Sequence, residues 1–260
     1  MKTLAIIGGG NLGKSILNGI ISSNLILFNN IFITRRSISK IKDLESDLVT
    51  VTSDNILATK EADVIILAVK PFKIEGILDE IKDELNSSKI IISVVTGTGI
   101  NTIRKYTDAK IYRAMPNTAV AIKESITMIA GEYDNESNEL VKTIFDQVGE
   151  TVEIDEEMMG AATVLGACGI AFALRYLRAA TQGGIEIGFS SKTSQFIAAQ
   201  TVKGACELIL QNGTHPEEEI DKVTTPMGVT ISGLNEMEHQ GFSSALIKGL
   251  ITSYDKVKKM

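Results

Sequence analysis

Short runs of β-branched and other apolar residues alternate with amphipathic stretches through the first half of the chain. The runs predict strands, and they cover residues 4–7, 31–34, 49–51, 64–69, 90–95, 110–114, 126–129 and 151–154. Helix-length stretches lie between several of them, at residues 11–22, 73–85 and 136–148. Strands that alternate with helices indicate βαβ units and a mostly parallel sheet.

The pattern changes after about residue 154. Strand-like runs stop, and apolar residues recur at helical spacing over residues 162–186, 191–211, 230–240 and 242–257. We therefore predict an α/β protein with a doubly wound, mostly parallel sheet over residues 1–154 and an all-helical domain over residues 155–260. Its helices are rich in glycine and alanine, which suits either an intertwined oligomer or a compact bundle. The residues alone leave both open.

A glycine-rich turn follows the first predicted strand. The pattern Gly8-x-Gly10-x-x-Gly13 stands between a strand and a helix, which is the context in which this motif binds dinucleotides. The glycines allow a sharp turn and a close approach of the pyrophosphate, which then meets free amides at the helix N-terminus. A glycine turn without a ligand is the alternative. The motif favours a Rossmann domain, and therefore an NAD(P)-dependent oxidoreductase.

The end of the second predicted strand distinguishes the two nicotinamide cofactors. A chain that binds NAD carries Asp or Glu there for the ribose hydroxyls. Here Arg35, Arg36 and Ser37 follow the strand, and two guanidiniums with a hydroxyl suit a 2′-phosphate. Ser37 also resembles a helix N-cap, and arginines are common near exposed helix starts. The sequence favours NADP(H), with NAD(H) as the less favoured cofactor.

Three further segments follow strands at the same predicted edge of the sheet. Ligands of doubly wound sheets lie at the carboxyl ends of the strands. Each segment alone could be an ordinary strand-ending turn, but together we expect them to line the nicotinamide side of the cofactor. They are Val69-Lys70-Pro71-Phe72, Val94-Val95-Thr96-Gly97 and Arg113-Ala114-Met115-Pro116-Asn117-Thr118.

Composition narrows the class of protein. The net charge of −6 argues against nucleic acid or an anionic membrane as the main partner. The only cysteines, Cys168 and Cys206, form no CxxC pair, which argues against a disulfide framework or structural zinc and favours a reducing compartment. His215 and His239 are too few and too far apart in sequence for a His-rich metal site, so we expect no metal.

We expect neither a targeting segment nor a membrane span from this sequence. The first apolar run is short and is interrupted by Gly8 and Gly10, so we expect no signal peptide. Residues 15–34 are too polar for a membrane span, and the apolar stretch 158–174 is too short for one. We therefore predict a cytoplasmic protein with a small-molecule substrate.

Four motifs, in this order and at these spacings, resemble the pyrroline-5-carboxylate reductase family. The first is shared by many dehydrogenases, whereas the four together are more specific, and they extend over nearly the whole chain. They are Ile7-Gly8-Gly9-Gly10-Asn11-Leu12, Ala68-Val69-Lys70-Pro71, Arg113-Ala114-Met115-Pro116-Asn117-Thr118, and Thr225-Pro226-Met227-Gly228-Val229-Thr230-Ile231 followed by Gly241-Phe242.

The resemblance implies hydride transfer from NADPH to the cyclic imine 1-pyrroline-5-carboxylate, which gives L-proline. It also implies a helical domain that interlocks with a second subunit, and therefore a homodimer or a higher homo-oligomer. The cofactor site that it implies, together with the residues named above, comprises Ile7, Gly8, Gly9, Gly10, Asn11, Leu12, Arg35, Arg36, Ser37, Asn55, Ala68, Val69, Lys70, Pro71, Val94, Val95, Thr96, Asn117 and Glu156.

The segment 225–230 is the expected substrate site. A proline and a glycine shape a turn before an amphipathic helix, so successive amides and the helix dipole could bind a carboxylate. An ordinary helix cap is the alternative. With the resemblance, we expect Thr230 to be the catalytic residue that reaches the ring nitrogen. The substrate-binding residues would be Thr225, Met227, Gly228, Val229 and Thr230.

The sequence departs from the family mainly at this substrate end. Residues 167–172 read Ala-Cys-Gly-Ile-Ala-Phe where the family has Gly-Ser-Gly-Pro-Ala-Tyr, and Met227 replaces a glycine. Formation of proline is the leading interpretation. A paralogue that reduces another cyclic imine or a keto acid is one alternative, and a non-catalytic NADP-binding regulatory protein is the other.

Overall fold

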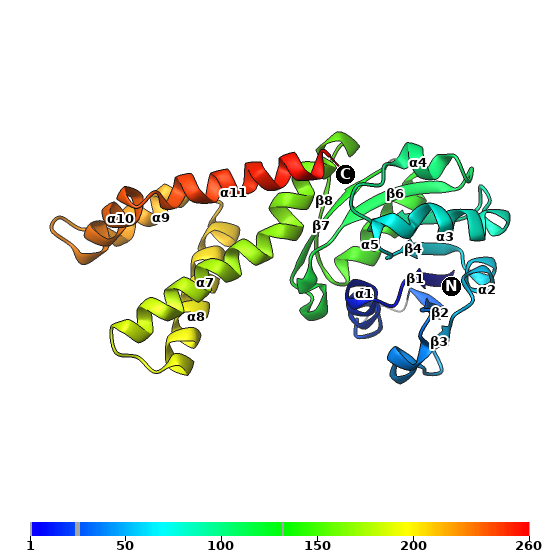
Figure 1. The fold of residues 1–260 in the computed structure, drawn as a ribbon, viewed down its shortest axis with the longest axis horizontal. Helices are drawn as coiled ribbons and strands as arrows, with labels where there is room; N and C mark the ends of the chain where they lie inside the picture. The colour runs from blue at the N-terminus through cyan, green and yellow to red at the C-terminus, as the bar shows by residue number, and fades with distance from the viewer. Residues whose placement is uncertain (1, 24–26, 132, 260) are drawn as a thin grey trace. The chain divides into compact units, whose positions relative to one another are not determined.

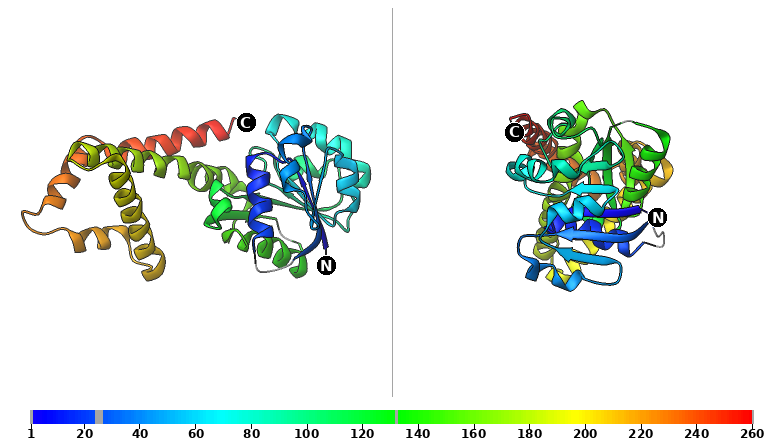
Figure 2. Two further views of the ribbon diagram at one scale, coloured as in Figure 1. Left: turned by 90° about the horizontal axis from the view of Figure 1, so that it is seen from below. Right: turned by 90° about the vertical axis from the view of Figure 1, so that its right-hand side faces the viewer.

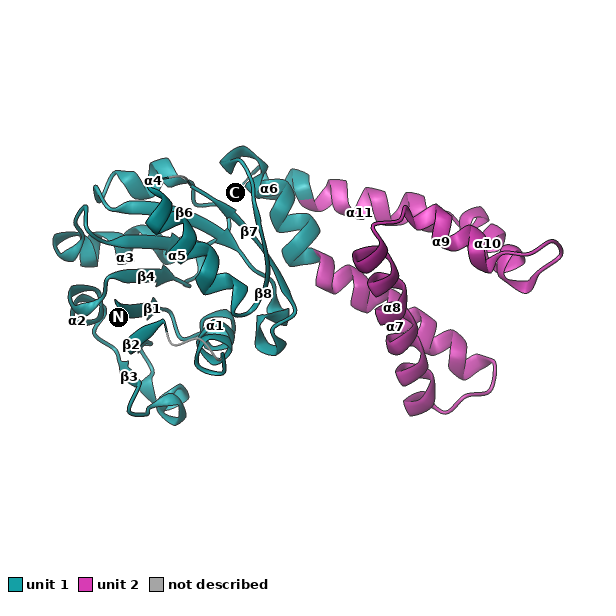
Figure 3. Cartoon of the chain, turned by 180° about the vertical axis from the view of Figure 1, so that it is seen from behind, with its two compact units in different colours: residues 1–168, 254–260 teal, residues 169–253 magenta. Residues whose placement is uncertain are grey.

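The computed structural model describes residues 2–23, 27–131 and 133–259. Its contacts divide the chain into two compact units, residues 1–168 with 254–260 and residues 169–253 (Figure 3). The first unit holds the sheet and the second is built from helices. The domain boundary expected after residue 154 stays a prediction, because these units are defined by contacts alone.

An eight-stranded sheet forms the centre of the first unit, with the strand order β3-β2-β1-β4-β5-β6-β7-β8 (Figure 1). Strands β1 to β6 pair in parallel, β7 runs antiparallel to β6, and β8 is parallel to β7. This is the predicted doubly wound, mostly parallel sheet. The strands are β1 Lys2–Ile7, β2 Phe28–Thr34, β3 Val49–Thr52, β4 Val64–Leu67, β5 Ile90–Ser93, β6 Lys110–Met115, β7 Ser125–Ala130 and β8 Gly149–Glu153.

Helices cover both faces of this sheet, because the residues of each central strand are apolar on both sides. Leu4 and Ile6 of β1 pack with the buried residues of α1 and α5 on one face. Ala5 and Ile7 pack with α2, α3 and α4 on the other. The view along the sheet separates the two layers (Figure 2, left). The helices are α1 Asn11–Ile21, α2 Asn55–Glu61, α3 Ile74–Ile81, α4 Ile100–Arg104 and α5 Asn135–Asp146.

Short 3₁₀ turns join several of these elements. They are η1 Ile38–Lys40, η2 Lys42–Leu44, η3 Pro71–Lys73, η4 Lys82–Glu84, η5 Thr118–Ile122 and η6 Glu156–Met158. Two strands end earlier than their apolar runs predict, at Leu67 and Ser93. The backbone continues the sheet by one further bond in each case, since the Ala68 amide donates to the Ile7 carbonyl and the Val94 amide donates to the Leu67 carbonyl.

The remaining chain is helical, as predicted. In the first unit, α6 Met159–Ala162 runs into a π-helical segment, η7 Thr163–Cys168. The second unit contains α7 Gly169–Glu186, α8 Ser191–Asn212, α9 Pro216–Val223, α10 Val229–His239 and most of α11 Phe242–Val257. Helices α7 and α8 pack closely: the Ser194 hydroxyl donates to the Thr181 carbonyl, and a Cβ on Gly184 would lie 2.0 Å from that hydroxyl.

The second unit has almost no interior of its own. Among residues 169–253, all of which are described, only Thr181 and Ser194 are buried, and neither is hydrophobic.

The helical stretch Glu156–Glu186 is long and apolar enough to cross a membrane by length and composition, and 17% of its most apolar window is buried. It is longer than the stretch 158–174 considered in the sequence, so shortness does not exclude a span. A core helix of a soluble protein meets the same criterion.

Candidate functional site

The three glycines of the Gly8-x-Gly10-x-x-Gly13 pattern differ in what surrounds them. Gly8 has φ +117°, and a Cβ there would lie 2.3 Å from the Ala68 carbonyl oxygen. A Cβ on Gly13 would lie 2.2 Å from the Gly8 carbonyl oxygen, so this glycine lets α1 pack against the turn. A Cβ on Gly10 would meet nothing within 4 Å. The space in front of Gly10 is therefore open to a ligand.

The start of α1 suits a phosphate. Gly10 is the N-cap, and no side chain caps the helix. The first amides of a helix have no partner within it, and they carry the positive end of its dipole. Open space before Gly10 and an uncapped helix fit the pyrophosphate of a dinucleotide. The turn follows β1, which lies next to β4 in the sheet. The strand order reverses between these two strands, and ligands of doubly wound sheets bind at such a point.

The two arginines after β2 have different surroundings. Arg35 is half-buried, and its Nη1 donates to the Gly9 carbonyl at 2.6 Å. The Gly9 amide in turn donates to the Thr34 carbonyl at 2.7 Å, so the glycine turn and the end of β2 are held together. Arg36 and Ser37 are exposed. Ser37 precedes η1 but makes no side-chain cap bond, so the structure gives no support to its interpretation as a helix cap.

Asn55 is the first residue of α2, and its side chain has two partners. Its Oδ1 accepts from the Thr34 hydroxyl at 2.6 Å, and its Nδ2 donates to Glu80 at 3.1 and 3.2 Å. Thr34 is buried at the end of β2, which brings Asn55 beside Arg35. Sequence reasoning missed Glu80, because no motif connects a residue of α3 to one of α2.

The segments after β4 and β5 lie at the same edge as the glycine turn, since these strands are parallel to β1. The side chains of Ile7, Val94 and Val95 are buried in the cores. These three residues can therefore meet a ligand only through their backbone. Thr96 is half-buried, and Lys70 is exposed.

Asn117 follows β6 and uses its side chain within the protein. Its Oδ1 accepts from the Ala119 amide at 2.9 Å and caps η5, while its Nδ2 donates to the Gly166 carbonyl at 3.3 Å. The residue is 7% exposed. Its role at the cofactor stays a prediction.

Glu156 makes two contacts through a single oxygen. Its Oε1 accepts from the Ile100 amide at 2.6 Å and lies 3.3 Å from Nη1 of Arg113. Burial lowers the pKa of Arg113, and the charge of Glu156 opposes that shift. The carboxylate therefore connects the start of α4 to β6.

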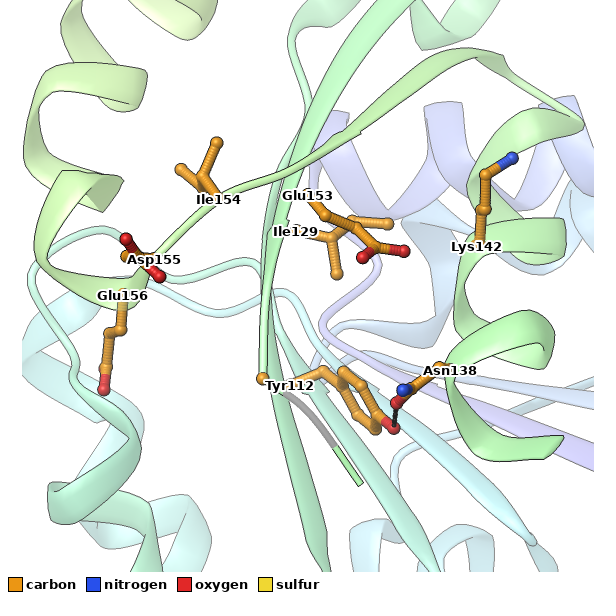
Figure 4. A pocket seen from close by; sticks show the side chains of 9 residues that line it. Tyr112, Ile129, Asn138, Lys142, Glu153, Ile154, Asp155 and Glu156 are labelled. Carbon is orange, nitrogen blue, oxygen red and sulfur yellow. Dashed lines mark hydrogen bonds between the residues drawn. The ribbon is translucent and has the colours of Figure 1, made fainter. Parts of the chain in front are cut away.

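A cavity of about 420 Å³ opens beside Glu156 (Figure 4). Of the residues expected to bind the cofactor, only Glu156 lines it. Its lining is otherwise drawn from β6, β7, α5 and the end of β8, and comprises Tyr112, Ile129, Gly131, Asn138, Lys142, Glu153, Ile154 and Asp155. Among the residues that the structure describes, no group of three or more His, Cys, Asp or Glu side chains could hold a metal ion.

The expected substrate segment lies in the second unit and forms a tight turn. The Gly228 amide donates to the Thr225 carbonyl at 2.9 Å, with Pro226 and Met227 between them. Met227 has φ +60°, a left-handed conformation that usually requires glycine or asparagine at this position of a turn. The side chains of Met227 and Val229 are almost fully exposed.

Helix α10 begins directly after this turn, at Val229, with Gly228 as N-cap and no side-chain cap. Thr230 is exposed in its first turn. The segment therefore has the uncapped amides and exposed hydroxyl that a carboxylate site needs. The structure places the predicted cofactor residues in the first unit and this segment in the second.

Two parts of the chain match known families. Residues 156–260 match the family described as pyrroline-5-carboxylate reductase dimerisation. Residues 3–97 match the family described as NADP oxidoreductase, coenzyme F420-dependent.

Relatives and solved structures give the same result over the whole chain. Pyrroline-5-carboxylate reductase 2 of Dictyostelium discoideum is 43% identical, with 99% of this chain and 93% of the relative covered. Reductase 1 of that organism is 44% identical over 99% of this chain, which spans about half (49%) of that longer protein. The crystal structure of Plasmodium falciparum pyrroline carboxylate reductase with NADP bound has a TM-score of 0.90 at 26% identity, covering 99% of this chain and 97% of that one.

Proposed function

The chain belongs to the pyrroline-5-carboxylate reductase family, and we infer that it reduces 1-pyrroline-5-carboxylate to L-proline with NADPH. The observation that carries this inference is the 43% identity to a named reductase over nearly the full length of both chains. The glycine turn supports it independently, because its open space and uncapped helix fit the cofactor.

The cofactor is NADP(H), which supplies the hydride when it is bound. We propose that the first amides of α1 bind its pyrophosphate and that Arg35, Arg36 and Ser37 bind the 2′-phosphate. Asn55 would contact the adenosine end, and the backbone after β4 and β5 would line the nicotinamide end. The parallel strands support this division, because their carboxyl ends share one edge.

We propose that the turn at residues 225–230 binds the substrate carboxylate through the amides that begin α10. The hydroxyl of Thr230 would accept a hydrogen bond from the N–H of the protonated imine and orient its carbon toward the hydride donor. A protonated imine is already electrophilic, so the chain needs no strong acid. Thr230→Val tests this role, since it should lower kcat and leave the Kd for NADPH unchanged.

We also propose that the active protein is a homodimer or a higher homo-oligomer in the cytoplasm. The apolar surface of the second unit, which coincides with the matched dimerisation family, supports an oligomer. The free thiols of Cys168 and Cys206 support a reducing compartment. Fractionation of cells that express the full chain tests the location.

The reaction is tested by following NADPH oxidation with three additions: 1-pyrroline-5-carboxylate, the homologous six-membered imine, and no substrate. We expect turnover with the five-membered ring. Turnover with the six-membered ring alone would instead support a paralogous reductase. Tight NADPH binding without turnover would support a regulatory protein.

A further inference from the structure

Arg113 is a buried cation inside a cofactor-binding unit. It lies on β6 with 8% of its surface exposed, and its Nε has no hydrogen-bond partner among the described residues. Alternation along β6 places it on the same face as Ile111, which packs in the core that contains α4. A buried guanidinium is stable only beside an anion. Glu156 is that anion, at 3.3 Å.

Glu156 also replaces a missing helix cap. Helix α4 begins at Ile100 after Gly99, and Gly99 has no side chain to cap it. The Ile100 amide donates instead to Oε1 of Glu156 at 2.6 Å. A Cβ on Gly99 would lie 3.3 Å from that same oxygen, so the glycine leaves room for the carboxylate.

These contacts fix two segments that end at the cofactor edge. The first is the backbone 94–99, which connects β5 to Ile100 and includes Thr96 at the proposed nicotinamide end. The second begins at Arg113 and continues through the end of β6 to Asn117. Glu156 is far from both in sequence. Among the described residues, its side chain is the one that accepts a hydrogen bond from the start of α4.

We propose that Glu156 and Arg113 are positioning residues for hydride transfer, and that Glu156 acts through the backbone of residues 94–100 rather than by binding the cofactor. This rests on the function proposed above. The carboxylate fixes the Ile100 amide, and Arg113 fixes the carboxylate. A displacement of about 1 Å in the groups that orient the reactants can lower the rate about a hundredfold.

The direct role that the sequence suggested for Glu156 fits these contacts less well. Its Oε1 already accepts from the Ile100 amide and pairs with Arg113. The positioning role predicts that kcat changes while cofactor affinity does not, which separates it from direct binding.

The test compares the full-length variants Glu156→Ala and Glu156→Gln with the control Glu157→Gln. Glu157 is the exposed neighbour in the same turn, with no hydrogen bond or ion pair among the described residues. We expect Glu156→Ala to lower kcat by about tenfold or more, and Glu156→Gln to retain much of it, because an amide oxygen still accepts from the Ile100 amide. The control should match the wild type. The Kd for NADPH should stay constant throughout.

Glu156→Ala leaves a buried cation without a partner and could fail to fold. The double variant Arg113→Met, Glu156→Gln then decides, because it removes the cation and keeps the acceptor for Ile100. We expect it to fold and to exchange its Ile100 amide hydrogen faster than Glu156→Gln alone, because Arg113 no longer fixes the acceptor.

Several results would overturn the proposal. A parallel rise in the Kd for NADPH would make Glu156 a cofactor ligand. An unchanged kcat with a lower melting temperature would make the pair purely structural. Exchange at Ile100 that is no faster in the double variant than in Glu156→Gln would show that Arg113 does not fix the acceptor. A wild type that does not reduce the imine would instead overturn the proposed function, and with it any role in hydride transfer.

Discussion

Each residue of the glycine turn meets a different constraint. Gly8 and Gly13 are required by close backbone contacts, because a Cβ on either would overlap a carbonyl oxygen. Gly10 has no such neighbour, and its lack of a side chain leaves space only for something outside the chain. The binding surface is therefore centred on Gly10, whereas the other two glycines build the turn that presents it.

The two arginines after β2 test which nicotinamide cofactor the turn holds. Replacing both Arg35 and Arg36 by Ala should raise the KM for NADPH at least about tenfold, because charge-assisted bonds to the 2′-phosphate are lost. The KM for NADH should rise much less, through the loss of the Arg35 bond to the Gly9 carbonyl alone. Steady-state kinetics with both cofactors measures the difference. Equal effects on the two cofactors would show that these arginines do not bind a 2′-phosphate.

Met227 tests the strain in the proposed substrate turn. Its φ of +60° suits glycine better than methionine, so Met227→Gly should raise the free energy of unfolding by about 1 kcal/mol. Met237→Gly is the matched control, because Met237 lies within the regular helix α10. This change should instead lower the free energy of unfolding by about 1 kcal/mol. Urea unfolding at one protein concentration measures both. A lower free energy of unfolding in Met227→Gly would show that Met227 is not strained in this turn.

Sequence reasoning found the residues that belong to contiguous motifs. It missed Glu80, and it named Arg113 only as part of a motif, without a role at the site. Their partners Asn55 and Glu156 lie on other elements. Such pairs depend on how the elements pack, and a single sequence contains no record of that. The left-handed Met227 was also hidden, since methionine gives no local signal for a positive φ.

At the scale of the elements, strands were easier to predict than short helices. The sequence predicted a run near each of the eight strands, although β8 contains a single apolar residue, Val152. Helices α2 and α4 have seven and five residues, too few for a clear helical period. A signal for α2 was nevertheless present, because Asp54 is an N-cap whose carboxylate accepts from the Leu57 amide.

Helix α5 is held at its start by Asp134, which makes its stability sensitive to acid. Lys110 pairs with the carboxylate and the Ser137 amide donates to it, and both hold its pKa well below the ordinary value. The charged form therefore stabilises the folded chain above the unfolded pKa of about 3.9, and this contribution is lost as pH falls toward the lower folded pKa.

Asp134→Asn should flatten the acid side of the stability profile. The amide cannot titrate, so the free energy of unfolding should fall less steeply below about pH 4 than in the wild type. Urea unfolding between about pH 3 and pH 6 measures the slopes. Glu139→Gln, a change at an exposed residue of the same helix with no side-chain hydrogen bond or ion pair among the described residues, is the control. Identical slopes for Asp134→Asn and the wild type would show that Asp134 does not contribute to the loss of stability in acid.

At the scale of the molecule, the two units differ in how they are stabilised. The first has a hydrophobic core on each face of its sheet and a smaller cluster where Met159 packs against β6 and β7. The second buries no hydrophobic side chain, although its helices carry many. A unit of this kind needs a partner surface, and the residues matched by the dimerisation family include all of it.

A substitution at Phe196 tests whether the second unit needs a partner surface. This residue is 70% exposed on α8, and Phe196→Glu should shift the protein toward monomers, because a carboxylate would be buried in the interface. Light scattering after size-exclusion chromatography measures the mass. Ile122→Glu, a matched change at a residue of the first unit with 71% exposure, should leave the mass unchanged. A monomeric wild type, or an unchanged Phe196→Glu, would contradict an interface on α8.

The central claim is that hydride passes from NADPH to the imine carbon of 1-pyrroline-5-carboxylate. The most direct test supplies NADPH with deuterium at the transferred C4 position and determines the product by mass spectrometry. The account predicts L-proline that carries one deuterium, formed in equal amount to the NADPH oxidised. Oxidation of NADPH without labelled proline, or no oxidation with this imine, would contradict it.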